Sequence, residues 1–402
     1  MQSIETRSSW IVATVALAIM ALAFGAPWII VVALKGIAEE VGGARSVPSL
    51  ASSMAWFGSA VGGIVMGRIA EKVGVRWTVM FGGAMIGVGL VLSSGGEVWQ
   101  LTAGHGLFIG LLGIGGINAP FYVYVSQWFD VHRGSALALI SSGSYLAGAI
   151  WPSIFERAIA HFGWRQTMFY FSAAVMATII PLAAIFLRAP PAPLPVTGTA
   201  DAAGTGKAVI GWPPNLVFAF LAAASFLCCI PMSMPQAHLV AFCSDIGISR
   251  AHGAAMLSVL LGAAFVSRQV WGWISDRIGG LNTVLASSAS QAAMMTGFLL
   301  TQDEIGLFAV AAAFGLGFGG LIPAYVLALR QLFPVGEAYW RIPALLLCSG
   351  SGMAAGGWLG GVLYDYFGFY GPAFAAGIIA NIFNLALVGS LVWRRKFVVA
   401  RA

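Results

Sequence analysis

Residues Ser267 to Leu281 read SRQVWGWISDRIGGL, and this stretch decides the fold class. A charged turn, Gly272 to Gly279, separates two long apolar segments, and Arg268 lies eight residues before Asp276. At 1.5 Å rise per residue, eight helical residues span about 12 Å, which approaches the middle of a hydrocarbon layer about 30 Å thick. A charge at that depth is costly unless it faces protein or a water-filled cavity, so Arg268 is a candidate functional residue.

The composition of the chain is that of a membrane protein. Of 402 residues, 59% are hydrophobic and only 8% are charged, whereas a soluble domain has roughly 25% charged residues. The net charge of +6 is explained by the loops that carry it, and the scattered basic residues argue against nucleic-acid binding. The four cysteines show no CxxC spacing, which predicts neither a disulfide framework nor a metal site.

Apolar runs of about 18 or more residues, broken by Gly, Pro or a charge, predict twelve membrane-spanning helices. Their expected limits are 10–33, 48–68, 77–94, 99–127, 135–156, 165–187, 214–241, 252–273, 282–301, 305–329, 342–363 and 371–393. The segment 188–213 is rich in Pro, Ala, Gly and Thr and is expected to be a flexible linker on the cytoplasmic side. It would join an N-terminal six-helix bundle, 1–187, to a C-terminal six-helix bundle, 214–402.

The two halves of the chain repeat the charged turn. Residues 67–74, GRIAEKVG, match residues 272–279, GWISDRIG, at an offset of 205. The glycine pairs at 115–116 and 319–320 match at an offset of 204. Such marks at nearly one offset indicate internal duplication, which is how many secondary transporters are built.

Lysine and arginine counts favour an orientation with both termini in the cytoplasm. With the termini inside, the expected inner segments carry fourteen of these residues and the outer loops five, and with Arg268 these account for all twenty. This is the asymmetry that the positive-inside rule describes. We therefore expect a multi-pass protein of the plasma (bacterial inner) membrane.

The duplicated turn, the twelve expected helices and the linker resemble the major facilitator superfamily over essentially the whole chain. The resemblance implies an all-α fold of two pseudo-symmetric bundles that rock about a substrate site near the bilayer midplane. In that family the duplicated turn latches neighbouring helices on the cytoplasmic side. The resemblance therefore assigns gating to Gly67, Glu71, Lys72, Gly272, Asp276 and Arg277. The alternative is a solvated turn with no gating role.

The chemistry around Arg268 favours an anionic ligand. Every acidic residue falls in an expected loop, tail or helix end, so no carboxylate is predicted at the depth of Arg268. A guanidinium fork matches a carboxylate in a bidentate way, which makes an anionic substrate the simplest partner. The alternative is that Arg268 donates to backbone carbonyls or lies nearer to the cytoplasmic water.

Narrower resemblances point to the branch of monocarboxylate transporters and oxalate–formate antiporters. Arg268 and the segment 128–148 resemble monocarboxylate transporters, and the segment 238–249 is similar to bacterial oxalate–formate-type carriers. Two family features are missing, because Ala264 stands where proton-coupled relatives carry an acid and Ser349 stands where the oxalate carrier has a second cation. One cation balances one negative charge, so a monoanion is favoured over a dicarboxylate.

Further candidates for the substrate cavity are aromatic or polar residues in apolar helices. By similarity to the oxalate carriers, Trp28 and Asn118 fall at cavity-lining positions. A tyrosine hydroxyl in an apolar helix needs a partner, which can be ligand or protein, and Trp271 shares a helix face with Arg268. The full expected set is Arg268, Trp28, Asn118, Tyr122, Tyr145, Tyr325, Trp271 and Ser349.

The sequence thus predicts a secondary transporter of small organic monocarboxylate anions that works by alternating access. A coupled proton or counter-anion, by symport or antiport, stays open, and the chain is expected to act as a monomer in the lipid bilayer. The alternative is an efflux carrier of drugs or hydrophobic metabolites with the same fold. No P-loop, HExxH or Ser/His/Asp arrangement occurs in the sequence, so neither an enzyme nor a cofactor is predicted.

Overall fold

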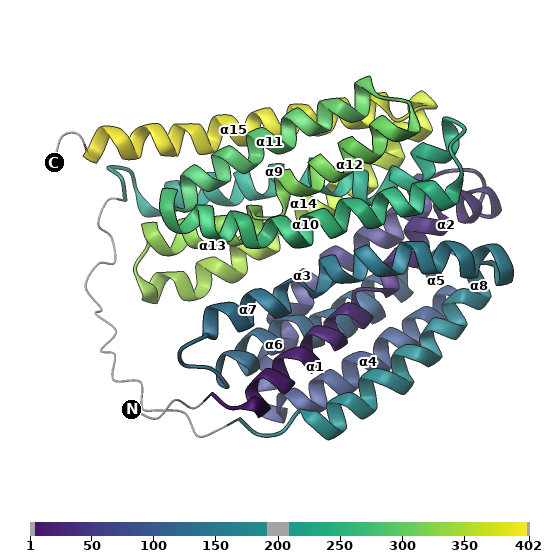
Figure 1. The fold of residues 1–402 in the computed structure, drawn as a ribbon, viewed down its shortest axis with the longest axis horizontal. Helices are drawn as coiled ribbons and strands as arrows, with labels where there is room; N and C mark the ends of the chain where they lie inside the picture. Colours follow the sequence, from purple (N-terminus) through teal and green to yellow (C-terminus); the bar gives the residue numbers. More distant parts are fainter. Residues whose placement is uncertain (1–4, 191–208, 400–402) are drawn as a thin grey trace. The chain divides into compact units, whose positions relative to one another are not determined.

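The computed structural model describes residues 5–190 and 209–399, and every regular element within them is a helix (Figure 1). The expected all-α class is therefore confirmed. Among the described residues, eleven helical segments are long and apolar enough to cross a membrane. Most of the expected linker, 191–208, lies outside the described residues.

The first half of the chain forms α1 to α8 and one π-helix. In order these are α1 (Arg7–Ala23), α2 (Ala26–Glu40), α3 (Ser46–Val73), α4 (Val75–Ser93), α5 (Val98–Ala103), the π-helix η1 (Gly104–Ile114), α6 (Gly115–Ser126), α7 (Arg133–Ser141) and α8 (Gly143–Phe186). The second half forms α9 (Pro214–Asp245), α10 (Arg250–Ile278), α11 (Gly280–Leu300), α12 (Glu304–Phe318), α13 (Leu321–Leu332), α14 (Val335–Phe367) and α15 (Gly371–Val399).

The chain divides into two compact units, and their limits differ from the two halves of the sequence. The first unit contains Met1–Val196 together with Ala237–Ser258, and the second contains Thr197–Gln236 and Val259–Ala402. The end of α9 and the beginning of α10 therefore belong to the first unit.

The longest helix, α8, covers most of two expected spans, 135–156 and 165–187, and lies within one of the eleven segments. Its 44 residues would extend about 66 Å if straight, about twice the hydrocarbon thickness. Gly163 interrupts it with φ 77° and ψ 163°, a non-helical conformation that favours glycine. Two helical stretches therefore meet at Gly163, within a single one of the eleven candidate spanning segments.

The duplicated turn has the same backbone conformation in both halves. Gly74 has φ 93° and ψ 147°, and Gly279 has φ 79° and ψ 162°. Each glycine ends one helix and is followed at once by the next, α4 or α11. Because a side chain rarely adopts such a φ, glycine at these two positions fixes the sharp reversal between spans.

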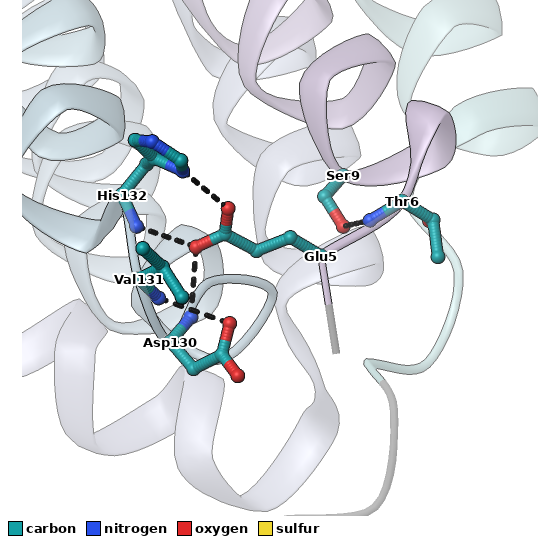
Figure 2. A network of polar contacts seen from close by, with 6 residues as sticks. All are labelled: Glu5, Thr6, Ser9, Asp130, Val131 and His132. Atoms are coloured by element: carbon teal, nitrogen blue, oxygen red, sulfur yellow. Dashed lines mark hydrogen bonds and ion pairs between the residues drawn. The ribbon is translucent and has the colours of Figure 1, made fainter. Parts of the chain in front are cut away.

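The beginning of α1 is fixed to the loop between α6 and α7 (Figure 2). The Glu5 carboxylate accepts hydrogen bonds from the backbone N–H of Asp130 at 3.1 Å and of His132 at 2.5 Å. Its other oxygen lies 2.6 Å from Nδ1 of His132. Trp10 packs edge-on against Phe129, with ring centroids 5.0 Å apart. The charged end of α1 therefore has partners before the apolar span begins.

This network predicts a pH dependence. Although desolvation favours the neutral acid, hydrogen bonds from the main chain and side chain of His132 lower the pKa of Glu5 below its ordinary value of 4.5. A lowered pKa stabilises the fold above the unfolded value and loses that effect as the pH falls through the folded value. We expect Glu5→Gln to lower the melting temperature at pH 7, with the difference from wild type vanishing well below pH 4.5.

The measurement is the melting temperature of both proteins in detergent across this pH range. The matched control is Glu39→Gln, which changes an exposed acid at the far end of α2. A constant difference between Glu5→Gln and wild type at all pH values would contradict the assignment.

Candidate functional site

Arg268 lies beside a break in the helical path of the second unit. Helix α12 ends at Phe318 and α13 begins at Leu321, with Gly319 and Gly320 between them. Arg268 is half-buried on α10, and its Nε atom donates to the carbonyl oxygen of Gly319 at 3.3 Å. The backbone-carbonyl contact considered as an alternative is therefore present. A carbonyl oxygen orients a guanidinium but carries no net charge.

Two neighbours of Arg268 donate to the same region of α12. The Ser267 hydroxyl donates to the carbonyl of Gly315 at 3.0 Å, and the Trp271 indole donates to the carbonyl of Leu316 at 2.8 Å. The last four carbonyls of a helix lack partners within it. Side chains of α10 therefore satisfy carbonyls that the end of α12 leaves open, and this fixes the position of Arg268.

Close backbone approach makes this arrangement possible. A Cβ atom at Gly319 would lie 2.2 Å from Oγ of Ser267, and one at Gly320 would lie 2.1 Å from Cβ of Trp271. Any side chain at either position would push α10 away from the break. The sequence showed the glycine pair only as a mark of duplication, and its position inside an apolar run was the signal for the break.

The first unit repeats this packing without a cation. At the offsets of the duplication, Gly115 corresponds to Gly319 and Gly62 corresponds to Ser267. A Cβ at Gly115 would lie 2.7 Å from the backbone of Gly62, so the two helices approach equally closely there. The position that corresponds to Arg268 is Gly63, and a Cβ there would be in ordinary contact with Ala119 at 3.4 Å. Close approach of the two helices at this point therefore does not by itself require an arginine.

The structure separates the other expected cavity residues between the two units. Trp28 on α2 and Tyr145 on α8 are buried in the first unit, where Asn118 and Tyr122 on α6 are half-buried. Of the predicted cavity residues, Trp271 lies at the same helix break as Arg268. Ser349 is buried on α14, where its hydroxyl donates to the carbonyl of Leu345 at 3.0 Å and pairs with the hydroxyl of Ser225.

Tyr325 belongs to a buried polar network that sequence reasoning missed. Its hydroxyl donates to Oδ1 of Asn384 at 2.5 Å, and Nδ2 of Asn384 donates to Oγ of Ser288 at 2.9 Å. Asn381 continues the network by donating to Oε1 of Gln291 at 3.1 Å. All five side chains are fully buried, and they join α13, α15 and α11. The tyrosine hydroxyl therefore has a partner inside the unit, which supports a packing role rather than contact with substrate.

The expected gating residues lie at the two duplicated turns. Glu71, Lys72, Asp276 and Arg277 are exposed, and the Arg277 guanidinium stacks 3.2 Å from the ring centroid of Trp273. A Cβ atom at Gly67 or Gly272 would meet no heavy atom of the described structure within 4 Å. The gating role of these six residues stays a prediction.

The described residues contain no group of three or more His, Cys, Asp or Glu side chains that could hold a metal ion. The helix break brings together a cation, a hydroxyl, an indole and backbone carbonyls.

Comparison with known proteins identifies the family. The sequence model of the Major Facilitator Superfamily matches residues 14–339. The chain belongs to this superfamily. It is therefore a multi-pass integral membrane protein of a family of carriers, which bind small molecules in a lipid bilayer. The resemblance noted in the sequence is confirmed.

Relatives in the superfamily include proteins of two kinds. The chain is 26% identical to monocarboxylate transporter 13 of Bos taurus over 351 residues, covering 86% of this chain and 79% of the relative. It is also 26% identical to the agnestins efflux protein of Paecilomyces divaricatus over 263 residues, covering 64% of this chain and 58% of the relative. A bacterial homologue of the human lysosomal transporter Spinster has the same fold, with a TM-score of 0.68, 15% identity and coverage of 98% and 97%.

The network around Tyr325 predicts that this residue affects stability more than transport. Tyr325→Phe removes the hydroxyl and leaves a buried amide oxygen of Asn384 without its donor, which costs about 1–3 kcal/mol. We expect a lower melting temperature in detergent and an unchanged KM for transport. Tyr170→Phe, at an exposed tyrosine, is the control for loss of a hydroxyl. A raised KM at normal stability would return Tyr325 to the substrate cavity.

Proposed function

We propose that the protein is a secondary transporter of small organic monocarboxylate anions, with Arg268 as the group that binds the carboxylate. The observation that carries the proposal is the difference between the two copies of one packing motif. The first unit packs its helices with Gly63 at this position, whereas the second places an arginine there, whose Nε donates to the carbonyl of Gly319. A charge inside a span is costly and is retained where it serves function.

The surroundings of Arg268 support an anion as its ligand. The bond from Nε to Gly319 fixes the plane of the guanidinium, and fixed orientation lowers the entropy lost when a carboxylate binds in a bidentate way. Broken helices commonly form the substrate sites of secondary transporters. The likeness to monocarboxylate transporter 13 supports the same substrate class.

The remaining features of the proposal follow from the family mechanism. Gly163 would divide α8 into two spans, which gives twelve spans with both termini in the cytoplasm of a plasma membrane. The bundles 1–187 and 214–402, joined by 188–213, would alternate access to the site, with the two duplicated turns as cytoplasmic gates. The proposed cavity residues besides Arg268 are Trp28, Asn118, Tyr122, Tyr145 and Trp271, whereas Ser349, like Tyr325, has hydroxyl partners within its own unit.

Replacement of Arg268 tests the proposal. Two charge-assisted hydrogen bonds are worth about 1.5–3 kcal/mol each, so Arg268→Ala should weaken carboxylate binding by at least about 100-fold. Arg268→Lys should also fail, because an ammonium is a point charge without the planar fork. The measurements are uptake into proteoliposomes and thermal stabilisation of the purified protein by a panel of small monocarboxylates.

The matched control is Arg250→Ala, which removes an exposed arginine at the beginning of the same helix. We expect this variant to retain uptake and ligand stabilisation. Normal transport by both Arg268 variants would refute the assignment of the carboxylate site.

The second candidate is an efflux carrier of drugs or hydrophobic metabolites, which the likeness to the agnestins efflux protein favours. The same binding panel separates the two classes. Short carboxylates should compete and stabilise if Arg268 binds the substrate, whereas lipophilic cations or neutral compounds would do so in the efflux alternative.

A further inference from the structure

A second arginine holds a carboxylate in the first unit. Arg45 lies in the turn between α2 and α3, and its side chain is only 6% exposed. Its Nη1 and Nη2 atoms donate to the two oxygens of Asp245 at 2.5 and 2.6 Å. Nζ of Lys35 lies 3.4 Å from the same carboxylate. Two cations thus hold one carboxylate, which is the chain's own aspartate.

The two sides of this site come from distant parts of the sequence. Asp245 is the last residue of α9 and follows Arg45 by 200 residues. The segment Ala237–Ser258 belongs to the first unit, and Ser258 adds a hydroxyl contact with Ser153 of α8 at 3.0 Å. The turn between α9 and α10 is thus attached to helices of the first half of the sequence.

The acid at the corresponding helix end in the first half of the sequence has different partners, so the pairing of Asp245 is not a general feature of such helix ends. Glu40 ends α2 at the position that corresponds to Asp245, at the offset of 205. Its carboxylate pairs with Arg165 at 2.5 Å and accepts from the indole of Trp164 at 3.0 Å, both on α8 of its own half. Asp245 instead finds its cations in the other half of the sequence.

The ion pairs at this site join two cations to one carboxylate. Arg45 and Lys35 supply two positive charges, and Asp245 supplies one negative charge. A buried guanidinium that loses its carboxylate is strongly destabilising unless water or another anion takes its place. When the turn after α9 moves away, Arg45 and Lys35 become a cationic patch that attracts anions.

We propose that Arg45 and Lys35 form an outer binding site for the substrate carboxylate, which Asp245 fills in the conformation seen here. In the proposed topology the turns after α2 and α9 face the outside. When this side opens, Asp245 leaves and an incoming carboxylate takes the same fork before it reaches Arg268. The identity of the ligand rests on the proposed function, whereas the carboxylate site itself does not.

The decisive experiment replaces the internal carboxylate by an external one. Asp245→Ala is made in the full-length chain with Arg268→Ala, so that binding at the proposed main site cannot contribute. The melting temperature in detergent is titrated with acetate, with chloride at equal ionic strength as the control. We expect a lowered melting temperature that acetate restores in a saturable manner, and no restoration when Arg45→Gln is added.

The proposal would be overturned if acetate did not restore the melting temperature selectively, or if it still did so with Arg45→Gln. The Arg45–Asp245 ion pair would then be only a structural contact between the two turns. If Asp245→Ala yields no folded protein, a substitution of the half-exposed Lys35 tests the proposed outer site instead. Lys35→Gln should raise the KM for a carboxylate added outside by about threefold to tenfold with kcat unchanged, and an unchanged KM would overturn the proposal. Arg157→Gln, at another exposed cation, is the control.

Failure of the proposed function gives a different pattern. If Arg268 variants transport normally while acetate still restores the Asp245→Ala protein, the outer carboxylate site stands and the main site lies elsewhere.

Discussion

Backbone carbonyls left open at the end of α12 determine the arrangement around Arg268. In a bilayer every polar backbone group needs a partner within the protein, and the end of α12 leaves carbonyls open inside a span. Ser267, Arg268 and Trp271 supply the donors, and the glycine pair 319–320 allows α10 to come close enough. The position of the cation is therefore a consequence of the helix break, since the same contact that satisfies the backbone also fixes the guanidinium.

The sequence predicted the features that depend on local patterns. Apolar runs marked the spans because burial in lipid requires about twenty apolar residues, and the charged turns marked their ends. Gly74 and Gly279 were recognisable because the reversal requires glycine at each. The π-helix η1 was not predictable, because its packing depends on distant backbone contacts. One example is Gly62, where a Cβ would lie 2.1 Å from the carbonyl oxygen of Leu111.

The prediction of the candidate site rests on the same kind of local signal. A charge at membrane depth is visible from sequence position alone, and this singled out Arg268. The role of a tyrosine is not visible in this way, because it depends on whether another helix supplies a partner. Tyr325 finds Asn384 fifty-nine residues later, and only the fold brings these two side chains together. The helix break beside Arg268 was likewise not predicted from the sequence, since a glycine pair is compatible with close helix packing as well as with an interruption of the helix.

The two arginines differ in what an anion must do to bind. At Arg45 the chain already supplies a carboxylate, so an external anion must replace Asp245 and gains only when the turn after α9 has moved. At Arg268 the contact from Nε is to the carbonyl of Gly319, which orients the guanidinium without adding a charge. In the proposed cycle an anion would therefore exchange at Arg45 only while that end is open. A carrier built in this way would couple the arrival of its substrate to the opening of the outer turn, while the orientation of Arg268 would stay fixed by the helix break throughout the cycle.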